Sequence, residues 1–165
     1  MTRNKIDIYR LIAELNEAKD AMQKTAASNA KAWERIEMGA VDELDYMALA
    51  YTIHNIYGVV ENTGLRIARF FENNLNTDSW HKEIIERMKL EIPGLRKAFF
   101  SYEEYLLFDE LRAFRHVFRN LYNRALHIER LNSLQSKMPK ASDIFFAAIE
   151  KYIAFLNELS VKIQD

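Results

Sequence analysis

The sequence predicts an all-α protein, an up-and-down bundle of four long helices with one or two short helices. Apolar residues recur at spacings of three and four over long stretches, as they do on one face of an amphipathic helix. Only four glycines and two prolines interrupt the 165 residues, which favours long helices with short connections. No segment alternates polar and apolar residues as a half-buried strand does.

The first two long helices are predicted over residues 6–36 and 41–73, with Gly39 as the break between them. The apolar stripe of the first helix has six members: Ile8, Leu11, Ile12, Leu15, Ala18 and Met22. The second helix contains Gly58 and Gly64. Each glycine costs about 1 kcal/mol relative to alanine in a helix, so we expect a kink or a close helix contact at these positions.

Two capping signals follow. Thr77 or Asp78 is expected to cap a short helix, because either side chain can accept a hydrogen bond from the first helical turn. Ser101 and Glu104 form a predicted capping box, which opens a helix over residues 102–122.

The last part of the chain is expected to form a short helix that Pro139 stops, and then a final helix over residues 143–163 that Ser142 caps. We expect one domain over residues 1–165, in which residues 1–40 are partly an N-terminal extension.

Composition limits the function. Hydrophobic residues make up 49% of the chain and charged residues 28%, which is typical of a globular protein and not of a disordered one. The formal net charge is −1, so any affinity for nucleic acid must come from a local patch.

The absence of cysteine excludes disulfides and thiolate chemistry. No apolar run reaches the roughly 18 residues of a membrane span, and the N-terminus lacks the apolar core of a signal peptide. The default location is the cytoplasm.

The helix over residues 102–122 carries a polar strip opposite an apolar side that is expected to face the core. The apolar side has eight members: Leu106, Leu107, Leu111, Ala113, Phe114, Val117, Phe118 and Leu121. The strip has eight members: Asp109, Arg112, Arg115, His116, Arg119, Asn120, Tyr122 and Asn123. It contains three arginines and no lysine, and arginine is suited to forked contacts with phosphate. Only Asp109 offers a counter-charge within the strip. Tyr105, Phe108 and Tyr122 add aromatic faces on which a base could stack.

The polar strip has two alternative interpretations. One is an ordinary solvated helix face, and the other is a phosphate-binding surface in which Arg112, Arg119 and Tyr122 bind RNA. Glu110 lies on the apolar side of the same helix, where we expect it to pair with a cation from a neighbouring helix.

Metal chemistry is not expected. No histidine has a glutamate three residues before it, as a di-iron bundle requires, and no phosphate loop or dinucleotide fingerprint occurs. We therefore expect no metal and no cofactor.

The segment RHVFRNLY (115–122), preceded by DELRAF and followed by LHIERL, resembles the HepT-like branch of the HEPN superfamily over roughly residues 45–160. The resemblance implies a compact helical bundle that dimerises. It also implies a metal-independent ribonuclease, often a toxin paired with a nucleotidyltransferase antitoxin. The family signature is an arginine, four to six residues, a histidine, and a tyrosine two residues later. Arg115 matches the arginine, Asn120 occupies the place of the histidine, and Tyr122 matches the tyrosine that is nucleotidylated in such toxins.

Three functions remain open. The first is a ribonuclease toxin that uses Arg115, His116 and Asn120 as catalytic residues. His116 lies one turn before Asn120, which moves the proton-transferring nitrogen by about 6 Å along the helix axis. The second is a non-catalytic HEPN module that binds RNA or nucleotide or serves a nucleotidyltransferase partner. The third is a structural bundle that binds an acidic protein. We also expect a homodimer whose cleft is lined by residues 112–123.

Overall fold

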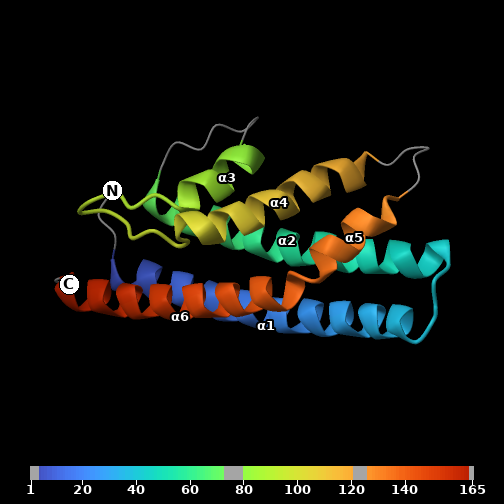
Figure 1. Cartoon of the computed structure of the whole chain (residues 1–165). Coiled ribbons are helices and arrows are strands. Elements are labelled where there is room, and N and C mark those ends of the chain that lie inside the picture. Colours follow the sequence, from blue (N-terminus) through green and yellow to red (C-terminus); the bar gives the residue numbers. More distant parts are fainter. Residues whose placement is uncertain (1–3, 73–79, 121–125, 164–165) are drawn as a thin grey trace.

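The computed structural model describes residues 4–72, 80–120 and 126–163. These residues form four long and two short helices, as predicted: α1 (Lys5–Glu37), α2 (Glu43–Phe71), α3 (Trp80–Met88), α4 (Tyr102–Arg119), α5 (Ile128–Gln135) and α6 (Met138–Lys162) (Figure 1). This part of the chain has no strand, and its one isolated β-bridge joins Ile92 to Arg96. The all-α prediction is therefore confirmed.

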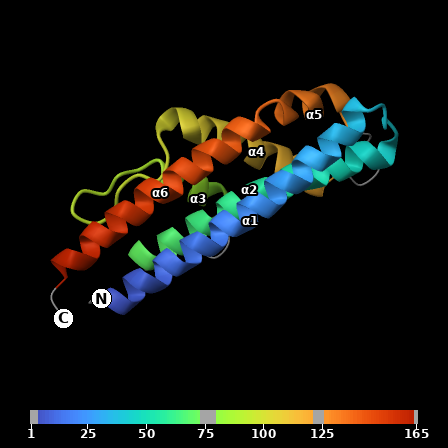
Figure 2. The ribbon, with the colours of Figure 1, turned by 90° about the horizontal axis from the view of Figure 1, so that it is seen from below.

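Helix α2 is the central element of the bundle. It packs along α1 on one side, carries α3 and α4 on another, and also contacts α5 and α6. Successive long helices run in opposite directions, so that α1 begins and α6 ends at the same end of the bundle (Figures 1 and 2). None of the helices in the described ranges is long and apolar enough to cross a membrane.

Side-chain caps fix where α2 and α4 begin. The Asp42 carboxylate accepts a hydrogen bond from the Asp45 N–H at 2.9 Å and so caps α2. At the start of α4, the Ser101 hydroxyl accepts from the Glu104 N–H at 3.2 Å, and the Glu104 carboxylate accepts from the Ser101 N–H at 2.7 Å. The predicted capping box is confirmed. Gly39, with a φ of 99°, makes the predicted break after α1.

The predicted start of the last helix is wrong. Helix α6 begins at Met138, so Pro139 lies in its first turn and Ser142 lies buried inside it. Proline is tolerated there because the first N–H groups of a helix have no intrahelical partner to lose. The predicted caps Thr77 and Asp78 lie outside the described residues.

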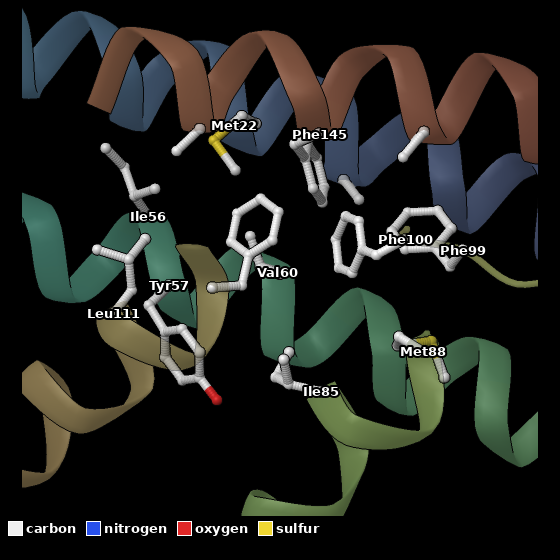
Figure 3. Close-up of a cluster of buried hydrophobic side chains, with 14 of the residues drawn as sticks. Met22, Ile56, Tyr57, Val60, Ile85, Met88, Phe99, Phe100, Leu111 and Phe145 are labelled. Carbon is white, nitrogen blue, oxygen red and sulfur yellow. The ribbon is translucent and has the colours of Figure 1, made fainter. Parts of the chain in front are cut away.

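Aliphatic and aromatic side chains together fill the core between the helices (Figure 3). Phe100, from the segment before α4, stacks on Phe108 with ring centroids 4.5 Å apart. Phe99 contacts Tyr152 of α6 edge-on at 5.4 Å. Because these residues join α4 and α6 through the segment that precedes α4, they fix how α4 lies on the bundle.

Candidate functional site

The rotation of α4 differs from the predicted one. The helix buries three side chains: Phe108, Leu111 and Phe114. Two apolar residues that were assigned to the core side, Leu106 and Val117, are 49% and 44% exposed. The prediction that Phe108 offers a stacking face is wrong, because its ring is fully buried against Phe100.

This rotation turns Arg115 toward α2. Its Nη1 donates a hydrogen bond to Oε2 of Glu61, and the two side chains are only 18% and 4% exposed. The guanidinium carbon lies 5.5 Å from the centroid of the Tyr57 ring, within the range of a cation–π contact. The Nε atom is buried and has no hydrogen-bond partner among the described residues. The guanidinium is thus enclosed between an aromatic ring and a carboxylate.

Tyr57 forms one wall of this enclosure and remains neutral. Burial raises the pKa of its phenol well above the usual value, and the nearby negative charge of Glu61 raises it further. Figure 3 shows the Tyr57 hydroxyl turned away from the labelled core side chains. Since the phenol does not ionise, its ring offers Arg115 a π face and no negative charge.

The outer side of α4 carries the other predicted residues. Arg112 donates from Nε to Oδ1 of Asp109 at 2.6 Å, and this hydrogen bond raises the pKa of the Arg112 guanidinium. His116, Arg119 and Asn120 are exposed on the last turn.

Asn120 is the C-cap of α4. Its side-chain amide donates to the main-chain oxygen of His116 at 2.8 Å, which satisfies one of the free carbonyl groups at the helix end. Tyr122, the remaining predicted site residue, lies outside the described residues.

The interpretation of Glu110 is confirmed. Both of its carboxylate oxygens accept from the Lys137 ammonium group, each at 2.7 Å, and Lys137 is the N-cap of α6. The carboxylate is 39% exposed, so it is an inter-element ion pair at the surface and not a buried charge.

Sequence reasoning missed Glu61 and Tyr57. The signal was present, because Glu61 lies on the face of α2 that also carries Ile53, Tyr57 and Gly64, all of them buried. A charged residue on an apolar stripe requires a partner of opposite charge when it is buried. That requirement could have pointed to an arginine on another helix. Within the described ranges, no group of three or more histidine, aspartate or glutamate side chains could hold a metal ion.

Comparison with known proteins gives the family. A family model described as HepT-like protein matches residues 48–156, which is more than half of the chain. The chain belongs to the HepT-like family. This confirms the resemblance to the HepT-like branch of the HEPN superfamily. No curated protein and no solved structure matches the chain. The HepT-like match begins inside α2 and ends inside α6, so it includes Glu61 and the whole of α4 but not α1.

Proposed function

We propose that this HepT-like protein is a metal-independent endoribonuclease and the toxin of a toxin–antitoxin pair. One observation carries the proposal. The exposed side chains of His116 and Arg119 lie on the last turn of α4, beside Arg115, which is held at the same end of the helix. The three residues combine an imidazole, which can act as a general base or a general acid, with two cations that bind phosphate.

The chemistry would use the 2′-hydroxyl of the RNA as the nucleophile. Its oxygen attacks the adjacent phosphorus, the bond from phosphorus to the 5′-oxygen breaks, and a 2′,3′-cyclic phosphate remains. His116 takes the proton of the 2′-hydroxyl, and an imidazolium returns a proton to the leaving oxygen. Arg115 stabilises the charge that develops on the phosphoryl oxygens.

A homodimer would complete this site. One helix offers a substrate a ridge, whereas two facing copies of α4 offer a groove with two copies of His116. One imidazole could then act as the base and the other as the acid. Two-fold pairing is also the commonest assembly of small proteins. An RNA substrate fits a cytoplasmic location for the toxin.

A second candidate is a non-catalytic HEPN module that binds RNA or serves a nucleotidyltransferase partner. Asn120 favours it. This residue occupies the motif position of the histidine, its amide is engaged with the His116 carbonyl, and an amide cannot exchange a proton near neutral pH.

RNA cleavage in the presence of EDTA separates the two candidates. We expect the wild-type protein to release products with 2′,3′-cyclic phosphate ends, and we expect His116→Ala and Arg115→Ala to lose this activity. His127→Ala is the matched control, because His127 is also exposed but lies at the start of α5. RNA binding without cleavage by the wild type would favour the second candidate. Activity that EDTA removes, or that His116→Ala retains, would contradict the first.

The proposed antitoxin is a nucleotidyltransferase that modifies Tyr122. AMP attached to this hydroxyl would bring a phosphate close in sequence to Arg119, where charge-assisted hydrogen bonds could hold it. The attached nucleotide would then compete with RNA for the same surface.

A further inference from the structure

Glu61 is a carboxylate in a place where stability alone gives little reason for one. Its side chain is 4% exposed, on a face of α2 that otherwise packs into the core. Taking a carboxylate and a guanidinium out of water costs about as much as their attraction returns, and an apolar pair of similar size is often equally stable. A buried ion pair of this kind therefore points to a need for an oriented cation.

The Tyr57 ring and the Glu61 carboxylate together form one binding site for the Arg115 guanidinium, which we call the seat. Tyr57 and Glu61 are four residues apart on α2, so their side chains lie on the same helix face, one turn apart. Arg115 reaches this face from α4, with Nη1 on the carboxylate and the guanidinium carbon near the ring. Nη1 is the one guanidinium nitrogen with a hydrogen-bond partner in the described part of the chain.

Arg112 forms an ion pair of a different kind, within its own helix and without an aromatic ring from α2. Arg112 bonds Asp109 three residues earlier on the same helix, and the two side chains are 26% and 35% exposed. Such a pair is screened by water and leaves the arginine free to change rotamer. The pairing of Arg115 with α2 instead fixes the guanidinium relative to a second helix.

We propose that Glu61, supported by the Tyr57 ring, is a positioning residue that holds the Arg115 guanidinium in a single orientation, with Nη1 bonded to α2 and Nη2 directed at a substrate phosphate. This inference rests on the proposed ribonuclease function, because it explains how Arg115 is held to stabilise the charge on the phosphoryl oxygens. A fixed guanidinium does not need to be ordered when the substrate binds, so its contribution falls mainly on the reaction step.

Chemical rescue tests the seat directly. Arg115→Ala leaves an empty space between Glu61 and Tyr57 that a free guanidinium ion can fill. We expect millimolar guanidinium chloride to raise the Tm of Arg115→Ala, whereas the same concentration of sodium chloride does not. The Tm of the double variant Arg115→Ala/Glu61→Gln should not rise. A rise of equal size in both variants would overturn the proposal, because the ion would then not require the carboxylate.

Cleavage kinetics test the positioning role. In Glu61→Gln the side chain keeps its shape and an acceptor oxygen but loses its charge. We expect kcat to fall on the order of 100-fold, as for a catalytic group displaced by about 1 Å, with little change in KM. The matched control is Glu110→Gln, which removes the charge of another paired carboxylate at the surface of α4. A fall in kcat of the same size in this control, or unchanged kcat in Glu61→Gln, would overturn the proposal.

A second variant guards against loss of folding. Arg115→Lys keeps a cation that can pair with Glu61, but its ammonium group has no second nitrogen with which to reach the phosphate. It should therefore fold, bind RNA and cleave it poorly. Wild-type cleavage by Arg115→Lys would refute the role of Nη2. If the wild-type protein does not cleave RNA, the proposed ribonuclease fails, and the Tm measurements still decide whether the seat exists.

Discussion

Alanine at Gly58 and alanine at Gly64 should change stability in opposite directions, although both glycines lie in α2. Each substitution removes the helix-propensity penalty of glycine, about 1 kcal/mol. At Gly58 an added Cβ meets nothing within 4 Å. At Gly64 it would lie 2.7 Å from Cγ2 of Ile84 and 3.2 Å from Cγ of Met88, both on α3. Figure 1 shows α3 lying beside this part of α2.

The difference between the two variants isolates the steric cost, because the propensity gain is common to both. Overpacking a core costs typically about 1–3 kcal/mol. Gly58→Ala should therefore be about 1 kcal/mol more stable than wild type, and Gly64→Ala about 0–2 kcal/mol less stable. For a chain of this size, 1 kcal/mol corresponds to about 2–4 °C in Tm.

Urea unfolding followed by circular dichroism, at one fixed protein concentration, measures both free energies. The fixed concentration matters because dimerisation would add to the apparent stability. Equal stability of Gly64→Ala and Gly58→Ala would refute the close packing of α3 on Gly64.

Three further predictions concern α4 and its surroundings. Asn120→His restores the motif histidine at an exposed position, and we expect cleavage in the presence of EDTA to rise by about 10²–10⁴-fold, the usual contribution of general acid–base catalysis; unchanged cleavage would contradict a role for this position. Co-expression with a cognate nucleotidyltransferase should add AMP to the wild-type protein and not to Tyr122→Phe, as measured by intact mass; equal added mass in both proteins would exclude Tyr122 as the acceptor. Arg119→Ala should reduce the salt dependence of single-stranded RNA binding by about 0.7 in the slope of log affinity against log salt, while Arg130→Ala on α5 leaves it unchanged; equal slopes in wild type and Arg119→Ala would show that Arg119 does not contact phosphate.

Local signals in the sequence were sufficient for most of the fold. The break between α1 and α2 was predicted from their apolar periods and from Gly39. The Asp42 cap of α2 was not predicted, although it also acts through adjacent residues. The start of α6 was predicted wrongly because proline occurs both after the end of a helix and in the first turn of a helix. A proline just before an apolar stripe is compatible with either position.

Buried polar contacts between distant segments could not be predicted in this way. Asn29 of α1 and Gln135 of α5 exchange two hydrogen bonds, at 2.8 and 2.9 Å, inside the bundle. Asn29 also donates to the Thr52 hydroxyl of α2 at 2.9 Å. Each residue taken alone is an ordinary polar member of a helix. These hydrogen bonds form only because three helices pack together, and the apolar period of a single helix does not predict that packing.

The same limit applied to the candidate site. The positions of Arg115, His116 and Arg119 on one helix could be seen in the sequence, but the rotation of that helix could not. A helical wheel treats every apolar residue as a core residue. It therefore placed the exposed Leu106 and Val117 in the core, and the predicted buried face of α4 is rotated from the observed one. Packing of Phe108 against Phe100 instead decides the rotation, and Phe100 belongs to a different segment.

The ion pairs on α4 change what its three arginines can contribute to binding. Arg112 has the carboxylate of Asp109, and Arg115 has the carboxylate of Glu61, so each of these cations already faces a negative charge. A phosphate that approaches them gains less Coulomb energy than it would from unpaired cations. No ion pair joins the exposed Arg119 to any residue in the described ranges. We therefore expect Arg119 to supply most of the salt-dependent affinity for RNA, and Arg115 to act mainly on the reaction step through its fixed orientation. Affinity and catalysis would then depend on different arginines of the same helix.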